Sequence, residues 1–156
     1  MSLERARAHL AKFGLDKKIL EFDVSSATVE LAAVAVGCES ARIAKTLSFL
    51  LGDSAVLILA AGDAKVDNKK YKAQFSAKAK MIPPEEVEAR TGHAPGGVCP
   101  FGINPGIDVY LDVSLERFPT VFPACGSANS AIELTPEELR KCSGAKAVID
   151  VCKLPE

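Results

Sequence analysis

The chain of 156 residues contains no tryptophan, and aromatic residues make up only 6% of it, although 48% of its residues are apolar. Its core is therefore expected to be mainly aliphatic. Charged residues make up 25%, which is the proportion of an ordinary globular protein. A chain of this length suits one domain and buries enough surface to fold without disulfide bonds. We therefore expect residues 1–156 to form a single domain.

Long apolar runs and an excess of positive charge are both missing. The longest apolar run, residues 55–61, is far too short to cross a membrane. The net charge is −1 at pH 7, whereas a protein that grips a long stretch of nucleic acid needs many lysines and arginines at the phosphates. We therefore expect no membrane contact and no extended nucleic-acid interface, while recognition of one nucleic-acid end stays open.

The cysteine pattern excludes a disulfide framework. The five cysteines are odd in number, form no CxxC pair and follow no signal peptide, so we expect reduced thiols in a cytoplasmic protein. They are widely dispersed, and only two histidines are available beside them. Zinc ligands are usually closely spaced in the sequence. We therefore expect neither a metal site nor a cofactor.

Three common catalytic or nucleotide-binding motifs are also missing. Neither GxGxxG nor GxxxxGK[ST] occurs, which disfavours a Rossmann or P-loop domain. The nucleophile elbow G-x-S-x-G does not occur either, so a serine hydrolase of that type is not supported.

Strand and helix patterns alternate along the chain without a regular βαβ rhythm. Period-two or continuous apolar patterns predict strands, and spacing of 3.6 with capping residues predicts helices. We therefore expect a mixed α/β fold, with a curved or barrel-like mixed β-sheet and helices packed around it. The predicted strands are residues 18–24, 42–51, 55–61, 108–113, 120–124, 131–134 and 145–151, and the predicted helices are residues 3–13, 28–36, 67–75, 83–92 and one that opens with a capping box at Thr135.

Lys45 is unusual because the period of the strand 42–51 places it on the face of the bulky apolar residues. A lysine there costs free energy unless its ammonium group finds a partner or a wet cavity. One interpretation is that the stem packs and the charge reaches water at the strand edge. The other is a cation that lines a pocket and holds a carbonyl, carboxylate or phosphate group.

The segment 91–102 contains the paired glycines Gly96 and Gly97 between two prolines. Glycine allows positive φ and close approach of a ligand, and proline stiffens the turn. Backbone N–H groups held in this way form an anion site or an oxyanion hole. A rigid connector between a helix and a strand is the alternative interpretation.

Cys99 and His93 lie in the same loop, so a thiol–imidazole pair is a further hypothesis for a nucleophile and its base. No helix N-terminus or third orienting group can be named beside them. A buried, inert cysteine is the more common behaviour of this residue.

Together these residues resemble the YbaK/prolyl-tRNA-synthetase-associated editing-domain family. The resemblance rests on the Ala44-Lys45-Thr46-Leu47 run, the apolar strand 55–61 and the order Gly92-His93 followed by the G-x-x-x-P loop from Gly96 to Pro100. It extends over nearly the whole chain. It implies the mixed α/β fold of that family and a free-standing aminoacyl-tRNA deacylase, often acting on tRNA(Pro).

The resemblance also implies site residues. The lysine matching Lys45 and the loop backbone would hold the terminal adenosine and the ester carbonyl. The implied catalytic set is Lys45, Gly96, Gly97, Val98, Cys99 and Pro100, and the implied substrate-binding set is Phe22, Thr46, His93, Phe101 and Gly126. The thiol matching Cys99 is not a general requirement of the family. We expect the nucleophile to be water or a group on the substrate.

The implied partner is the acceptor end of a mischarged tRNA, delivered by a synthetase or an elongation factor. Cysteinyl-tRNA(Pro) deacylases of the family carry an acidic residue in the segment that corresponds to residues 126–132, where the nearest equivalent here is Ala131. The amino acid removed is therefore left unassigned. Two alternatives stay open, namely a non-catalytic module that binds a nucleotide or acyl ligand, and a hydrolase that depends on Cys99 and His93.

Overall fold

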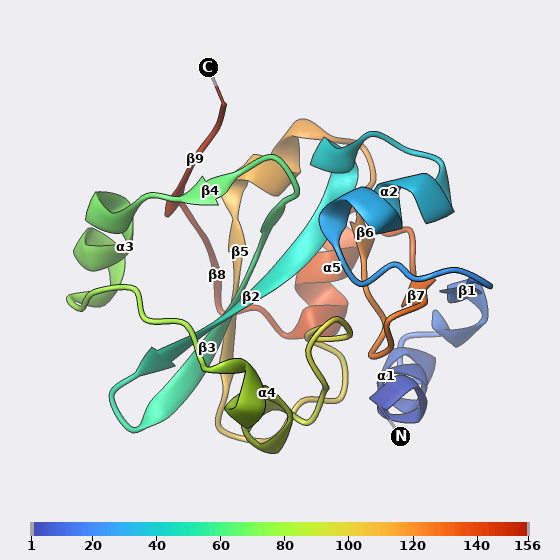
Figure 1. The fold of residues 1–156 in the computed structure, drawn as a ribbon, viewed down its shortest axis with the longest axis horizontal. Helices are drawn as coiled ribbons and strands as arrows, with labels where there is room; N and C mark the ends of the chain where they lie inside the picture. The colour runs from blue at the N-terminus through green and yellow to red at the C-terminus, as the bar shows by residue number, and fades with distance from the viewer. Residues whose placement is uncertain (1, 156) are drawn as a thin grey trace.

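A five-stranded mixed sheet in the order β6-β2-β3-β5-β8 forms the centre of the computed structural model, which describes residues 2–155 (Figure 1). Strands β2 and β3 are antiparallel, and the other three pairings are parallel. The sheet is strongly curled, with helices outside it. The expected curved mixed sheet is confirmed. Its strands are β2 (Ile43–Leu51), β3 (Ser54–Ala61), β5 (Asp108–Asp112), β6 (Phe122–Pro123) and β8 (Ala147–Ile149).

The central strand β3 is buried on both faces, as its continuous apolar sequence predicts. Only Ser54 at its start is exposed. Leu57, Ile58 and Leu59 are fully buried in the largest hydrophobic cluster. The strand is joined to β2 by a tight turn at Gly52, where φ is 61°. This hairpin carries Lys45, which is opposite Ala60 in the register.

Capping residues visible in the sequence mark the ends of α2, α4 and α5, whereas α1 ends at Ala11, two residues before its predicted end. Thr28 accepts a hydrogen bond from Leu31 N at the start of α2, and Thr135 forms the expected capping box at the start of α5. Glycines in the left-handed conformation end α2, α4 and α5. The helices are α1 (Ser2–Ala11), α2 (Val29–Val36), α3 (Asn68–Phe75), α4 (Pro84–Thr91) and α5 (Pro136–Ser143).

The prediction of a strand over residues 18–24 is largely wrong. A 3-10 helix spans Asp16–Lys18, and only β1 (Leu20–Glu21) is extended in a ladder. Strand β1 pairs with β7 (Ser130–Ala131), also shorter than the predicted 131–134. Its residues are exposed, so no buried face extends this pairing. The contact nevertheless holds the segment before α2 against the loop that precedes β7.

Some short elements have no counterpart among the predictions. Strands β4 (Lys65–Val66) and β9 (Cys152–Lys153) form a separate antiparallel pair, and 3-10 helices span Ser40–Arg42 and Val113–Arg117. Elements of two to five residues are too short to set up a hydrophobic period. Within residues 2–155, no helix is long and apolar enough to cross a membrane.

Candidate functional site

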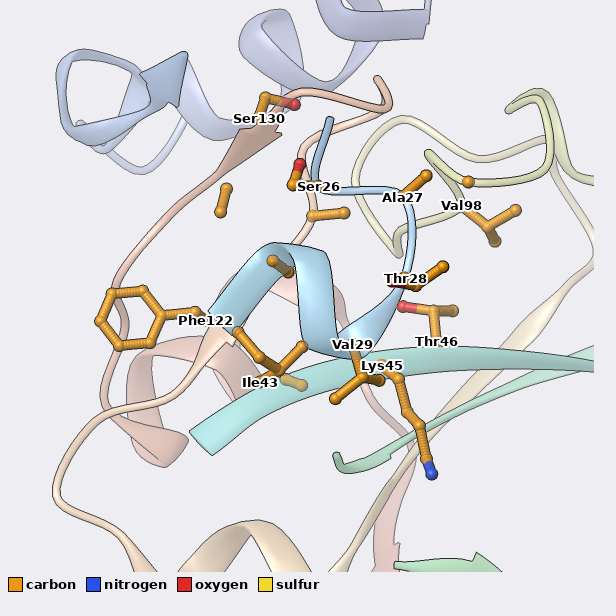
Figure 2. Close-up of a pocket in the computed structure, with 15 residues that line it drawn as sticks. Ser26, Ala27, Thr28, Val29, Ile43, Lys45, Thr46, Val98, Phe122 and Ser130 are labelled. Atoms are coloured by element: carbon orange, nitrogen blue, oxygen red, sulfur yellow. The ribbon is translucent and has the colours of Figure 1, made fainter. Parts of the chain in front are cut away.

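A pocket of about 160 Å³ opens where the pairing of β2 with β6 stops. That pairing covers only Ile43 and Ala44, so β2 is free of this neighbour from Lys45 onward. The N-terminal end of α2 lies across the gap (Figure 2). The lining residues are Ser26, Ala27, Thr28, Val29, Ala32, Ile43, Ala44, Lys45, Thr46, Gly96, Val98, Phe122, Ala124, Ser130 and Ala131.

The segment before α2 is fixed by the loop before β7. Ser26 N donates to Ala128 O at 2.6 Å, and Phe22 N donates to Asn129 O at 2.8 Å. The Asn129 amide in turn donates to Phe22 O at 3.0 Å. These contacts place the wall that carries Ser26 and Thr28 opposite strand β2.

Lys45 lines the pocket, but its ammonium group points away from Thr46 (Figure 2). The Nζ atom donates to Gly62 O at 3.4 Å and to Ala64 O, in the turn after β3. Burial lowers the pKa of this lysine. Lys45 therefore lines the pocket, while its head group rests on neutral backbone carbonyl oxygens. Among residues 2–155, no carboxylate forms an ion pair with Lys45, so its charge stays available to an anionic or carbonyl ligand.

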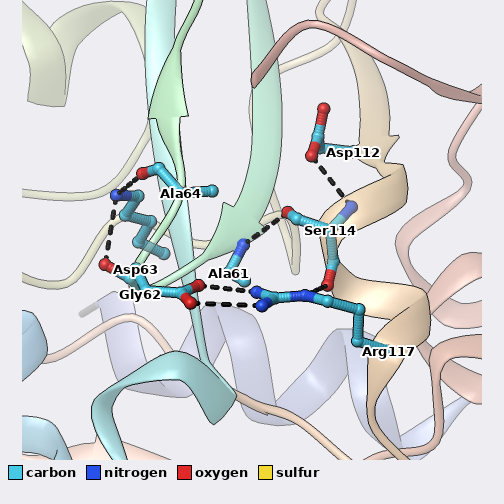
Figure 3. A network of polar contacts seen from close by, with 8 residues as sticks. Ala61, Gly62, Asp63, Ala64, Asp112, Ser114 and Arg117 are labelled. Carbon is cyan, nitrogen blue, oxygen red and sulfur yellow. Dashed lines mark hydrogen bonds and ion pairs between the residues drawn. The ribbon is translucent and has the colours of Figure 1, made fainter. Parts of the chain in front are cut away.

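The turn that holds the ammonium group is itself fixed by a polar network (Figure 3). Arg117 donates two hydrogen bonds to Asp63, Nη1 to Oδ2 at 3.1 Å and Nη2 to Oδ1 at 2.6 Å. This contact lowers the pKa of the Asp63 carboxyl group. Ser114 Oγ accepts from Ala61 N at 3.0 Å, and buried Asp112 accepts from Ser114 N at 2.9 Å. The Asp63 carboxylate therefore pairs with Arg117.

The two glycines of the predicted loop serve different purposes. Gly96 has a φ of 89° and lines the pocket. Gly97 has no positive φ, but a Cβ atom on it would lie 2.8 Å from the backbone of Gly126 and Ser127. Its N–H donates to Ala94 O at 3.0 Å, within the turn. The N–H groups of Gly96, Val98 and Cys99 have no acceptor among the described residues.

Cys99 and His93 are close together but are fully buried. Cys99 Sγ lies 3.6 Å from His93 Nε2, and that nitrogen is 2.7 Å from Phe101 O. Because a carbonyl oxygen only accepts, Nε2 carries the proton and cannot take one from the thiol. Burial raises the pKa of Cys99 to about 12 and lowers the pKa of His93. Neither residue lines the pocket, so this arrangement does not activate a thiol nucleophile.

The predicted site residues therefore fall into two groups. Lys45, Thr46, Gly96 and Val98 line one pocket. The others lie outside its lining, namely Phe22, His93, Gly97, Cys99, Pro100, Phe101 and Gly126. Gly126 is required for packing, since a Cβ atom there would lie 2.4 Å from Ser2 O.

Sequence reasoning missed most of the pocket wall opposite β2. Ser25, Ser26 and Thr28 all compete for the N-cap of the helix in the sequence, and the structure uses Thr28. A surplus of capping hydroxyls was therefore the available signal for Ser26. Phe122 lies within the predicted strand 120–124, but neither it nor Ser130 was predicted as a site residue, because each comes from a strand of only two residues.

An ammonium group and unpaired backbone N–H groups around a small pocket can together stabilise negative charge that develops on a carbonyl oxygen. Among residues 2–155, no three histidine, cysteine, aspartate or glutamate side chains gather as metal ligands. The described residues of the pocket therefore offer hydrogen-bond donors, namely the ammonium group and backbone N–H groups, that can stabilise negative charge on a substrate.

The sequence model of the aminoacyl-tRNA editing domain matches residues 23–142. The chain belongs to this family. It is 57% identical over 154 residues to the uncharacterized protein YwhH of Bacillus subtilis, covering 98% of both chains. It is 30% identical over 114 residues to EbsC of Enterococcus faecalis, provisionally named a Cys-tRNA(Pro)/Cys-tRNA(Cys) deacylase, covering 72% of this chain and 70% of EbsC.

A solved structure agrees with the family and with the fold. It is a crystal structure provisionally described as a trans-editing enzyme for prolyl-tRNA synthetase. The TM-score is 0.87, the sequences are 35% identical, and the alignment covers 97% of both chains. The predicted fold class and family resemblance are therefore confirmed.

Proposed function

We propose that this protein hydrolyses the ester bond of mischarged aminoacyl-tRNA in trans. The observation that carries the proposal is that Lys45, Gly96 and Val98 line one small pocket in a member of the aminoacyl-tRNA editing domain family. The pocket is below the roughly 300 Å³ of typical sites for drug-sized ligands. It suits an aminoacyl group, with the terminal adenosine outside.

The mechanism needs no side-chain nucleophile, because an aminoacyl ester is already labile. The free N–H groups of Gly96 and Val98 stabilise the developing oxyanion, and one such donor is commonly worth about 3 kcal/mol. Lys45 leaves the carbonyls of Gly62 and Ala64 and adds a charge-assisted contact to the substrate. Water, or a group on the substrate itself, attacks the ester carbonyl. The thiol of Cys99 takes no part, because it is buried outside the pocket lining.

The substrate is assigned to the acceptor end of tRNA(Pro). This part of the proposal is supported by the names of two relatives, since EbsC is named for Cys-tRNA(Pro) and the solved structure for prolyl-tRNA synthetase. A synthetase or an elongation factor delivers the tRNA.

The test is deacylation of tRNA(Pro) charged with alanine, cysteine, serine, threonine or proline. Lys45→Ala is expected to lower the rate at least about a hundredfold, the scale of losing an electrostatic contact to the transition state. Folding should be retained, because burial already disfavours this charge. The matched control is Lys70→Ala, since Lys70 also donates to a backbone carbonyl, Cys152 O at 3.0 Å, but does not line the pocket.

Unchanged rates in the Lys45→Ala variant would overturn the assignment of Lys45. Binding of aminoacyl-tRNA without turnover of any of the five substrates would overturn the deacylase and favour the non-catalytic binding module.

A further inference from the structure

Two buried hydroxyl groups in the wall of the pocket have no hydrogen-bond partner. They are Ser26 Oγ and Thr46 Oγ1. Ser26 is only 7% exposed. The other two unpartnered buried side-chain atoms of the described chain, in Tyr71 and His93, lie outside the pocket lining. Since buried polar groups are nearly always paired, each exception calls for an explanation.

The two remaining hydroxyl residues of the lining are occupied by the fold. Thr28 Oγ1 accepts from Leu31 N at 3.1 Å as the helix cap. Ser130 Oγ lies 2.6 Å from Ser127 Oγ. The same pocket thus contains two hydroxyls that stabilise the protein and two that do not. Ser26 and Thr46 stand on different walls, one before α2 and one on β2 (Figure 2).

The rest of the wall limits what can bind there. It is built mainly from small or apolar side chains, and Lys45 is the only charged residue among the described residues that line it. A cationic side chain would find no acidic partner in this lining, and a large one would exceed about 160 Å³. A small neutral side chain with its own polar atom fits both limits.

We propose that Ser26 and Thr46 bind the side-chain hydroxyl of the aminoacyl group, which makes seryl and threonyl esters the preferred substrates. The inference rests on the proposed function and names its substrate class. A hydroxyl donates one hydrogen bond and accepts others, so a substrate hydroxyl can pair with either protein group whether that group donates or accepts. An alanyl ester leaves both unpaired, and a cysteinyl thiol is only a weak donor.

The two residues contribute in different ways. Thr46 is β-branched and lies in β2 opposite Leu59, so its side chain has little rotational freedom. Ser26 is held through its backbone N–H by Ala128 O at 2.6 Å, while its side chain can turn among three staggered rotamers. Rotation of Ser26 brings its oxygen from the wall to the ligand. Thr46 is the fixed contact and Ser26 the adjustable one.

The experiment compares Ser26→Ala and Thr46→Val with the unchanged protein on seryl-, threonyl-, alanyl- and cysteinyl-tRNA(Pro). Each variant should lower the ratio of kcat/KM for the seryl ester to that for the alanyl ester at least about tenfold, because a site that pairs a hydroxyl rejects the analogue without it. Thr46→Ser keeps the hydroxyl and should retain the preference. Ser54→Ala, an exposed serine outside the pocket lining, is the control.

Thermal unfolding supplies a second readout. Removal of an unpaired hydroxyl should leave the melting temperature of Ser26→Ala unchanged or raised, whereas a structural serine would show a loss. A seryl-to-alanyl ratio that stays constant in both variants would overturn this inference and leave the deacylase intact. A clear preference of the unchanged protein for alanyl or cysteinyl esters would do the same. If no ester is hydrolysed, the proposed function itself fails.

Discussion

Gly96 and Gly97 carry different constraints although they are adjacent. At Gly97 an added methyl group would meet two backbone atoms 2.8 Å away, and neither can move without displacing the 126–127 segment. At Gly96 the nearest atom is Ala27 Cβ at 3.2 Å, but φ is 89°. Substitution of Gly97 is therefore limited by space, and substitution of Gly96 is limited by backbone conformation.

We therefore expect Gly97→Ala to be destabilised by about 1–3 kcal/mol, the usual cost of overpacking, and to lose at least about tenfold in deacylation rate as the loop is displaced. Gly96→Ala should also lose activity, through strain of about 1–3 kcal/mol in an unfavourable φ region. Denaturant unfolding and deacylation rates measure the two effects.

Val98→Ala is the comparison variant, since it shortens a half-buried side chain and leaves the loop backbone free. It should retain more activity than either glycine variant. Equal losses at all three positions would contradict a role for the loop backbone.

Lys45 illustrates how far individual positions could be predicted. Strand alternation singled it out, because period two is a local property of the sequence. The carbonyl oxygens that hold its ammonium group belong to Gly62 and Ala64. These contacts could not be predicted, because every residue has a backbone carbonyl and the residue type does not show which one accepts. Cys99 shows the reverse case. Its side chain attracted a chemical hypothesis, while its full burial depends on packing from distant segments.

Helix α2 supplies one wall of the pocket, so its cap links stability to activity. Thr28→Ala removes the hydroxyl that accepts from Leu31 N, and loss of such a cap typically costs about 1 kcal/mol. Fraying of the first turn also disturbs the wall at Thr28 and Val29. We expect both a lower free energy of unfolding and a lower rate of deacylation, measured by urea unfolding and initial rates.

Thr135→Ala is the matched control. Thr135 caps α5 in the same way, with Glu138 N donating to its hydroxyl at 3.0 Å, and it does not line the pocket. It should lose comparable stability and keep its activity under conditions where the protein stays folded. If both variants kept full activity, the order of α2 would not matter to the site.

Helices were predicted better than short strands for a physical reason. Capping residues, Pro at the first position and a closing glycine are all local, and Thr135, Pro136 and Gly144 provide all three for α5. Strands β1, β6 and β7 have two residues each and exist through their partners. Because β6 and β7 carry the far wall of the pocket, that wall could not be assembled from local patterns.

The pairing of β3 with β5 joins segments separated by about fifty residues, and β5 pairs in turn with β8. A mixed sheet was predictable because the elements do not follow a βαβ order. The strand order was not, since non-local pairing is set by which apolar faces fit together. The turn after β3 that holds the Lys45 ammonium group and the pocket both depend on this strand order.

The charge of the entire chain limits how it holds tRNA. With a net charge of −1, few phosphates can be neutralised, and the small pocket suits only the acceptor end. Each neutralised phosphate contributes about −0.7 to −0.9 to the slope of log K against log salt. With one or two such contacts, affinity for uncharged tRNA(Pro) should fall no more than about tenfold between 50 and 200 mM KCl, whereas six to ten contacts would lower it about 10³–10⁵-fold. Filter binding over that range measures the slope.

A minihelix that contains only the acceptor stem should bind as tightly as the full tRNA. A steep slope, or a minihelix that binds much more weakly, would show that the protein grips the tRNA body, and the acceptor-end picture would then be wrong.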